Sequence, residues 1–227
     1  MTNIILQHFD GDLRPLDELS VENISAYAKM IGAEYRLIRG KPFNKRLTGA
    51  CQKVHMINEE FDEYDQVCMV DIDMFAPKGM TENVFEQNGI GLHADTQTML
   101  HKKIVREYGI AMTDINKPYW GGAIYKMDQG LRKRLRSTLN KSDDMWMNKY
   151  NQPYHFEDEG IFHTLVVWSS AFIKKEEWYM DRKWCQCSFL PNPELAGFIH
   201  VRTKVTPTGP KRTKMENYKE LVDKGIL

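Results

Sequence analysis

The sequence predicts an α/β fold wound on a parallel sheet. Segments with the patterns of strands and helices alternate as β-α-β-α-β over residues 3–73, the order that right-handed crossovers between parallel strands produce. Residues 67–70 are all apolar, as in a strand that is buried on both faces. This run stops at Asp71 and Asp73, at the carboxyl end of the strand, where open α/β sheets place their ligands.

The first half of the chain supplies the elements of this sheet. Residues 3–7 form the first expected strand, and the helix after it has Ser20 as its expected cap and Gly32 at its end. Residues 35–38 form the second strand, which stops at Gly40. Both intervening helices are amphipathic. Their apolar positions are Ile24, Tyr27, Ala28 and Ile31 in the first, and Leu47, Ala50, Val54, Ile57 and Phe61 in the second.

The second half of the chain is less regular. Its expected strands are residues 89–93, 120–125 and 197–202, and its expected helices are 96–108, 131–139, 159–168 and 215–227. The helix around Leu135 has an expected basic outer face made of Arg132, Lys133, Arg134 and Arg136. Residues 204–214 are rich in Pro, Gly, Thr and Lys, which predicts a mobile loop.

Composition limits the classes of function. A length of 227 residues suits one sizeable domain, which we expect to span residues 1–227. Basic and acidic residues number 31 each, so no net charge draws nucleic acid or an anionic membrane to the chain. The four cysteines suggest no disulfide framework. The apolar run at residues 4–6 is too short for a secretory signal, and no stretch reaches the length of a membrane helix. We therefore expect a cytoplasmic protein.

Asp71 and Asp73 are the first indication of chemistry. Two carboxylates this close repel each other, and the pKa of one rises unless a cation lies between them. A hard divalent cation such as Mg²⁺ or Mn²⁺ is the simplest partner for their oxygen atoms. The pair alone is equally typical of an acidic loop in solvent, so the rest of the chain must distinguish the two interpretations.

Five motifs occur in the order found in GT-A-fold glycosyltransferases. Residues 64–73 resemble the strand and Asp-x-Asp motif of that family, and residues 119–125 resemble its acceptor-side strand with two glycines. Residues 156–162 are similar to the Asp-Gln segment that opens a late helix. Residues 198–201 resemble the strand that carries a metal-binding histidine in the retaining, glycogenin-like branch. Residues 23–32 resemble the first helix of related galactosyltransferases.

This resemblance implies a specific architecture. It spans roughly residues 3–205 and predicts a GT-A fold, a Rossmann-like mixed sheet with helices on both faces. Residues 1–75 would form a mainly parallel nucleotide-binding half, and residues 76–205 an acceptor-side half. Residues 206–227 would form a mobile loop and a C-terminal helix.

The resemblance also implies a metal-bound donor. Such enzymes transfer a sugar from a nucleotide sugar, for which we expect a UDP-sugar, to a hydroxyl of a glycan acceptor. Mn²⁺ or Mg²⁺ would stabilise the charge that develops on the leaving diphosphate. Asp73 would be the main metal ligand, Asp71 would share the ion or contact the ribose, and His200 would be a third ligand. An isolated strand histidine is more often a core residue, and the order of the motifs favours the ligand. His200 also favours a reaction with retention.

Residues at the end of the first expected strand would hold the donor. The resemblance places His8, Phe9 and Asp10 there, with Phe9 stacked on the base and Asp10 bound to a ribose hydroxyl. An ordinary turn from strand to helix explains these residues nearly as well. Lys53, with Arg46 nearby, would face the sugar phosphate, although a solvated basic face accounts equally for both.

Basic residues near the C-terminus would cover the diphosphate. Lys204, Lys211 and Arg212 would form a mobile lid. The sequence departs from the family here, because the His-x-x-Gly-x-x-Lys-Pro-Trp pattern that begins at His200 lacks the Gly and the Trp and has its Lys displaced. Which basic residue meets the diphosphate therefore stays open.

The remaining candidates lie near the sugar. Gly121 and Gly122 would let a sugar ring approach the backbone, although a bulge at the start of a strand is an equal explanation. Asp158, Glu159 and Asp95 are the candidate catalytic carboxylates, near the anomeric centre or on acceptor hydroxyls. The aromatic residues near these motifs suit sugar stacking, but core packing is the commoner use of each. They are Tyr119, Trp120, Tyr154 and Phe156.

Two other functions compete with glycosyl transfer. An Asp-x-Asp after an apolar strand also occurs in haloacid-dehalogenase-like phosphatases, in which Asp71 would be the nucleophile. That motif usually lies near the N-terminus and continues with Thr or Val where this chain has Phe75. A non-catalytic module that binds nucleotide sugars is the other alternative. The ordered motifs favour the metal-dependent glycosyltransferase.

Overall fold

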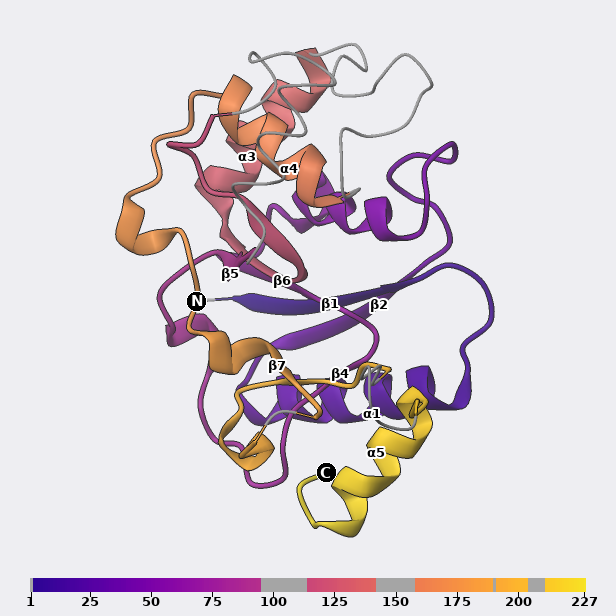
Figure 1. Ribbon diagram of the computed structural model, residues 1–227. Helices are drawn as coiled ribbons and strands as arrows, with labels where there is room; N and C mark the ends of the chain where they lie inside the picture. The colour runs from indigo at the N-terminus through magenta and orange to yellow at the C-terminus, as the bar shows by residue number, and fades with distance from the viewer. Residues whose placement is uncertain (1, 95–113, 142–157, 190, 204–210) are drawn as a thin grey trace.

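The computed structural model describes residues 2–94, 114–141, 158–189, 191–203 and 211–227 (Figure 1). Its main sheet has five strands in the order β2-β1-β3-β6-β5. β1 pairs in parallel with β2 and β3, whereas β6 is antiparallel to β3 and β5 is antiparallel to β6. The bounds are β1 (Asn3–Phe9), β2 (Glu34–Arg39), β3 (Gln66–Val70), β5 (Gly91–His93) and β6 (Trp120–Asp128). The mixed sheet with a parallel N-terminal half is thus confirmed.

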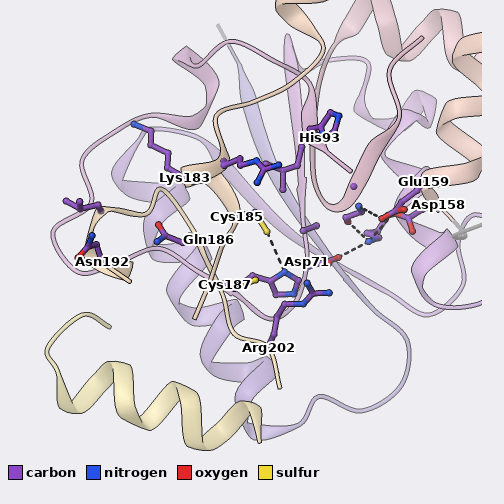
Figure 2. Close-up of a pocket in the computed structure, with 18 of the residues that line it drawn as sticks. Asp71, His93, Asp158, Glu159, Lys183, Cys185, Gln186, Cys187, Asn192 and Arg202 are labelled. Carbon is purple, nitrogen blue, oxygen red and sulfur yellow. Dashed lines mark hydrogen bonds and ion pairs between the residues drawn. The ribbon is translucent and has the colours of Figure 1, made fainter. Parts of the chain in front are cut away.

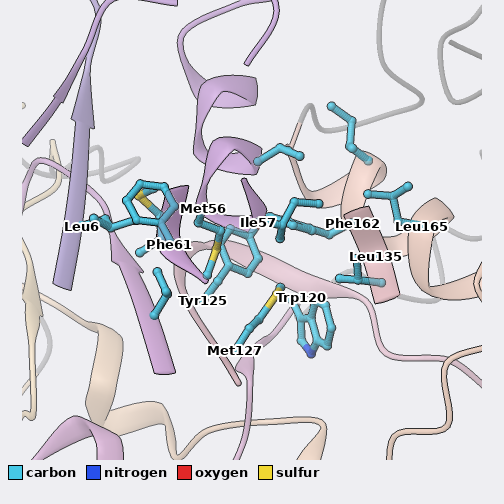
Figure 3. Close-up of a cluster of buried hydrophobic side chains, with 14 of the residues drawn as sticks. Leu6, Met56, Ile57, Phe61, Trp120, Tyr125, Met127, Leu135, Phe162 and Leu165 are labelled. Carbon is cyan, nitrogen blue, oxygen red and sulfur yellow. The ribbon is translucent and has the colours of Figure 1, made fainter. Parts of the chain in front are cut away.

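Helices cover both faces of this sheet (Figure 1). Helix α1 (Pro15–Met30) packs on the face that contains Ile5. The opposite face, which contains Leu6, is covered by two 3₁₀ helices and two α-helices. These are η1 (Ala50–Ile57), η2 (Glu59–Phe61), α3 (Gln129–Lys141) and α4 (Asp158–Trp168). Because side chains alternate along a strand, one apolar run fills both cores. Figure 3 shows the core on the face that contains Leu6, where Phe162 of α4 lies beside Tyr125 of β6.

A second, three-stranded sheet brings distant parts of the chain together. Its order is β4-β8-β7, with β4 antiparallel and β7 parallel to β8. The bounds are β4 (Met74–Phe75), β7 (Gln186–Cys187) and β8 (Ile199–His200). Helix α5 (Lys214–Asp223) packs on it, with the rings of Phe75 and Tyr218 5.1 Å apart. Met74 pairs with His200, so the loop after β3 lies next to the late strand.

Further 3₁₀ turns connect these elements. They are η3 (Val84–Glu86), η5 (Lys175–Glu177), η6 (Arg182–Cys185) and η7 (Pro193–Leu195). The expected helix at residues 96–108 lies outside the described residues.

Helix α1 begins earlier than the sequence predicted. Pro15 occupies its first turn. The carboxylate of Asp17 accepts from the amide of Arg14 at 3.0 Å, and the amide of Asp17 donates to the carbonyl of Arg14 at 2.9 Å. Ser20 is therefore not the cap: it is buried inside the helix, and its hydroxyl donates to the carbonyl of Met74 at 2.7 Å. Gly32 follows the helix with φ +72°, the left-handed conformation expected there.

The second expected helix is found, but in 3₁₀ form and in two parts. Asn58 interrupts it with an extended backbone, and its side chain accepts a hydrogen bond from the amide of Glu60 at 3.0 Å. Asparagine favours such local bonds over a continuous helix. The apolar positions Val54, Ile57 and Phe61 are nevertheless fully or almost fully buried, as the pattern predicted.

The expected basic outer face of α3 is wrong for Arg132. Its side chain is fully buried, and its guanidinium donates to the carbonyls of Met127, Phe61 and Tyr64 at 2.8, 2.9 and 2.7 Å. Buried carbonyls need donors, and the planar guanidinium supplies several at once. A charged residue thus joins the end of β6 to the stretch from Phe61 to Tyr64.

The four cysteines are all free, and Cys51 and Cys68 are buried. Among the helices that the structure describes, none combines the length and the hydropathy needed to cross a bilayer.

Candidate active site

The Asp-x-Asp loop is held from three sides. The amide of Asp71 donates to the carbonyl of Ala123 in β6 at 3.0 Å, and the carbonyl of Asp71 accepts from Gln7 of β1 at 3.0 Å. The carbonyl of Asp73 accepts from the amide of Val201, next to β8, at 2.9 Å. Both sheets therefore fix the backbone between the two carboxylates.

Three side chains form a candidate metal centre. One ligand atom from each of Asp71, Asp73 and His200 lies within 4.8 Å of the others. Asp73 Oδ1 and His200 Nε2 are 3.1 Å apart, and both side chains are largely buried. Two carboxylates and an imidazole are a donor set that suits Mn²⁺ and also accepts Mg²⁺ or other divalent ions. The structure thus brings together the three residues that the sequence motifs predicted as metal ligands.

A lysine that the sequence did not indicate already balances this centre. The ammonium of Lys214, the first residue of α5, forms an ion pair with Asp73 Oδ2. Burial would raise the pKa of Asp73, but the hydrogen bonds and charges of His200 and Lys214 outweigh it and hold the pKa well below its usual range. Lys214 lies 141 positions from Asp73, and no local pattern relates the two.

Lys53 connects the metal centre to the catalytic candidates. Its Nζ lies 2.8 Å from Asp71 Oδ1, 3.1 Å from Asp158 Oδ2 and 2.5 Å from the carbonyl of Gly122. Burial lowers the pKa of Lys53, but Asp158 and Asp71 more than offset this, so the lysine stays charged. The alternative of a solvated basic face is therefore wrong for Lys53, although Arg46 is exposed.

Asp158 and Glu159 lie in the first turn of α4 with different partners. Tyr125 donates its hydroxyl hydrogen to Asp158 Oδ2 at 2.7 Å, and the amide of Gly122 donates to Glu159 Oε1 at 2.7 Å. Burial raises the pKa of Asp158, against the opposing charge of Lys53. Burial and the nearby charge of Asp158 raise the pKa of Glu159 to about 7.

The two glycines of β6 have different surroundings. A Cβ atom on Gly122 would lie 3.0 Å from Asp158 Oδ2 and 3.3 Å from both Glu159 Oε1 and Lys53 Nζ. On Gly121 it would meet only the carbonyl of Leu92, at 3.9 Å. The pairing of β5 with β6 shifts register between Gly91 and Leu92, opposite this part of β6, an irregularity that agrees with the bulge interpretation. Gly122 leaves room for the charged cluster, a requirement that the sequence did not reveal.

Two cavities meet at the Asp-x-Asp loop. The smaller, of about 330 Å³, is lined by the three residues expected at the donor base and ribose, His8, Phe9 and Asp10, together with both aspartates of the loop. His8 Nε2 donates to the carbonyl of Gly40 at 2.6 Å, and burial lowers the pKa of its imidazole.

The larger cavity, of about 800 Å³, contains the candidate catalytic groups. Figure 2 shows Asp158 and Glu159 on one side of it and Lys183 and Asn192 on the opposite side. Lys53 and Asp71 line both cavities. Further lining residues are Gly121, Gly122, Cys185, His200 and Arg202.

Residues near His200 were missed in the sequence. Cys185 Sγ lies 3.5 Å from His200 Nδ1, and burial raises the pKa of the Cys185 thiol, so the sulfur stays protonated. Arg202 also lines the larger cavity. Alternation along a strand could have indicated Arg202, because it follows His200 by two positions. Cys185 belongs to another segment, and no local spacing relates it to His200.

Other expected residues lie elsewhere. Asp95, Lys204, Tyr154 and Phe156 fall outside the described residues. Of the proposed lid, Arg212 instead forms an ion pair with Glu220 of α5, and Lys211 is exposed. Tyr119 and Trp120 are buried in the core, which confirms the packing interpretation for both.

Comparisons with known proteins identify the fold. No protein-family model and no curated protein sequence match the chain. Solved structures do match. A glycosyltransferase involved in glycosylation of the major capsid of PBCV-1 aligns with TM-score 0.56 and 11% identity, over 98% of this chain and 100% of that chain. The galactosyltransferase LgtC, in complex with donor and acceptor sugar analogues, aligns with TM-score 0.54 and 13% identity, over 97% and 95%.

An active-site mutant of LgtC gives TM-score 0.52 and 14% identity with the same coverage. Likeness at these identities establishes the architecture rather than the reaction. The chain therefore has the GT-A-like fold of these glycosyltransferases, as the sequence predicted.

Proposed function

We propose that the protein is a metal-dependent glycosyltransferase that uses a nucleoside diphosphate sugar. The cluster of Asp71, Asp73 and His200 carries this proposal, because it lies where the two cavities meet in a fold shared with glycosyltransferases. The nucleotide would occupy the smaller cavity and the acceptor the larger one. UDP as the nucleotide and a glycan as the acceptor follow from the family resemblance.

The residues present fit a divalent cation. Asp71, Asp73 and His200 would hold it, and the ion would stabilise negative charge on the diphosphate as the bond to the sugar breaks. Lys214 balances Asp73 in the metal-free state.

The side chains around the sugar would have two roles, one to orient groups through ion pairs and one to exchange a proton. Lys53 forms ion pairs with Asp71 and Asp158 and so orients both carboxylates. Asp158 would accept hydrogen bonds from sugar hydroxyls. Glu159, with a pKa of about 7, would exchange a proton near neutral pH. We propose that the reaction proceeds with retention, because the resemblance around His200 implies it. In a retaining reaction the departing phosphate can take the acceptor proton.

Nucleotide and metal binding tests this proposal directly. Thermal unfolding would be followed with UDP, GDP or ADP, each with Mn²⁺, Mg²⁺ or EDTA. A nucleotide at a hundredfold excess over its dissociation constant adds ~2.7 kcal/mol to the free energy of unfolding. For a chain of this length the melting temperature rises by roughly 5–10 °C. We expect this rise with UDP and Mn²⁺, and its loss in EDTA.

Two variants locate the effect. Asp73→Asn should abolish the metal-dependent rise, whereas Asp223→Asn, an exposed aspartate at the end of α5, should keep it. No rise with any nucleotide would contradict the proposed donor site. Binding without hydrolysis or transfer across an acceptor panel would instead indicate the non-catalytic module. A covalent fluoroberyllate adduct on Asp71 would indicate the phosphatase.

A further inference from the structure

The imidazole of His200 has a partner on each ring nitrogen. Nε2 faces Asp73 Oδ1 at 3.1 Å, and Nδ1 faces Cys185 Sγ at 3.5 Å, a contact drawn in Figure 2. A histidine that binds a metal through one nitrogen carries its proton on the other, and a group that accepts this proton sets the orientation of the ring. In this chain that place is taken by a thiol.

The backbone fixes the sulfur beside the ring. Cys185 ends η6 immediately before β7, and β7 pairs in parallel with β8 so that Cys187 lies opposite His200. The amide of Gln186 donates to the carbonyl of Phe198 at 2.9 Å, which locks the register next to Cys185. The preceding residue, Trp184, is fully buried. Cys185 therefore has little freedom to leave His200.

We propose that Cys185 is a positioning residue for the metal centre, whose sulfur accepts the Nδ1 hydrogen of His200 and so directs the Nε2 lone pair toward the ion. The inference rests on the proposed metal site. Without an ion, Nε2–H can donate to Asp73 while the thiol donates to Nδ1. With an ion, Nδ1–H donates to the sulfur. A thiol serves both arrangements because it donates and accepts weakly.

Metal titration of the full chain tests the role without relying on turnover. Mn²⁺ affinity would be measured by electron paramagnetic resonance in wild type, Cys185→Ala, Cys185→Ser and Cys187→Ala. Loss of an outer partner of a metal-bound histidine typically weakens affinity about 10–100-fold. We expect such a loss in Cys185→Ala and recovery in Cys185→Ser, whose hydroxyl also donates and accepts. Cys187→Ala is the matched control, since it removes the neighbouring thiol of the same cavity.

A second readout uses the wild-type protein alone. Nitrogen-15 NMR of the Mg²⁺-loaded chain should show the His200 proton on Nδ1. A proton on Nε2, or Mn²⁺ binding by Cys185→Ala as tight as by wild type, would overturn the inference. Wild-type protein that binds no Mn²⁺ would overturn the proposed function together with it. A variant series that behaves as expected in a protein without transferase activity would leave the positioning role in place and contradict only the function.

Discussion

Replacing Glu159 by Gln should remove a specific pH dependence of stability. The glutamate is largely buried beside Asp158, and its Oε1 accepts a hydrogen bond from the amide of Gly122. Gln has nearly the same shape and keeps an acceptor oxygen for that bond. The substitution therefore removes the titrating proton and little else.

The sign and size of the effect follow from the pKa. Folding raises the pKa of Glu159 from 4.5 to about 7, so the folded chain binds the proton more tightly than the unfolded chain. The stability associated with the protonated form is fully present below pH 4.5 and is lost as the pH rises through about 7. Each pKa unit corresponds to 1.36 kcal/mol, so the loss approaches roughly 3 kcal/mol above pH 8.

Urea denaturation between pH 4.5 and 8.5 measures this loss. We expect the free energy of unfolding of Glu159→Gln to match wild type near pH 4.5 and to exceed it by up to roughly 3 kcal/mol at pH 8.5. Glu194→Gln, at an exposed site, controls for the general effect of losing one carboxylate. Parallel curves for wild type and Glu159→Gln would refute the raised pKa and the burial on which it rests.

Replacing Lys53 by Met should lower the free energy of unfolding at pH 8 by roughly 3 kcal/mol, because the buried carboxylate of Asp158 and the half-buried carboxylate of Asp71 lose their cation; urea denaturation that shows less than about 1 kcal/mol would contradict this. Gly122→Ala should cost about 1–3 kcal/mol, because its Cβ would crowd the charged cluster, and an unchanged melting temperature would show that the cluster opens freely. Lys214→Ala should tighten Mn²⁺ binding to the nucleotide-free protein, on the order of fivefold for a competing pair of roughly 1 kcal/mol. Lys219→Ala, exposed on the same helix, should leave Mn²⁺ affinity unchanged in calorimetric titration; equal affinities in all three proteins would show that Lys214 does not compete for Asp73.

Local patterns were enough to predict the parallel half of the sheet. The unbroken apolar run before Asp71 indicated a strand buried on both faces, and β3 pairs with β1 on one side and β6 on the other. Gly32 marked the end of α1 because a left-handed backbone favours glycine. The position of His200 beside Asp73 followed from the family resemblance, since nothing near either residue relates them.

The remaining features depend on contacts between distant segments. Arg132 fits the basic stripe of a surface helix, and its burial becomes visible only once the carbonyls of Phe61 and Tyr64 lie under it. The sequence around Lys53 contained no pattern that distinguishes a buried lysine from one exposed to solvent. For Ser20, helix spacing alone did not distinguish a cap from a position inside the helix.

The ion pair between Lys214 and Asp73 affects how the chain can be shortened or fused for study. Helix α5 supplies the cation of the metal-free centre, and Asn217 of the same helix donates to the carbonyl of Arg202 at 2.7 Å. A truncation before α5 would therefore change the charge of the centre as well as the length of the protein. Unfolding of this one helix would expose the carboxylate to competing ions, so metal affinity would report on the integrity of a segment 141 positions away in sequence.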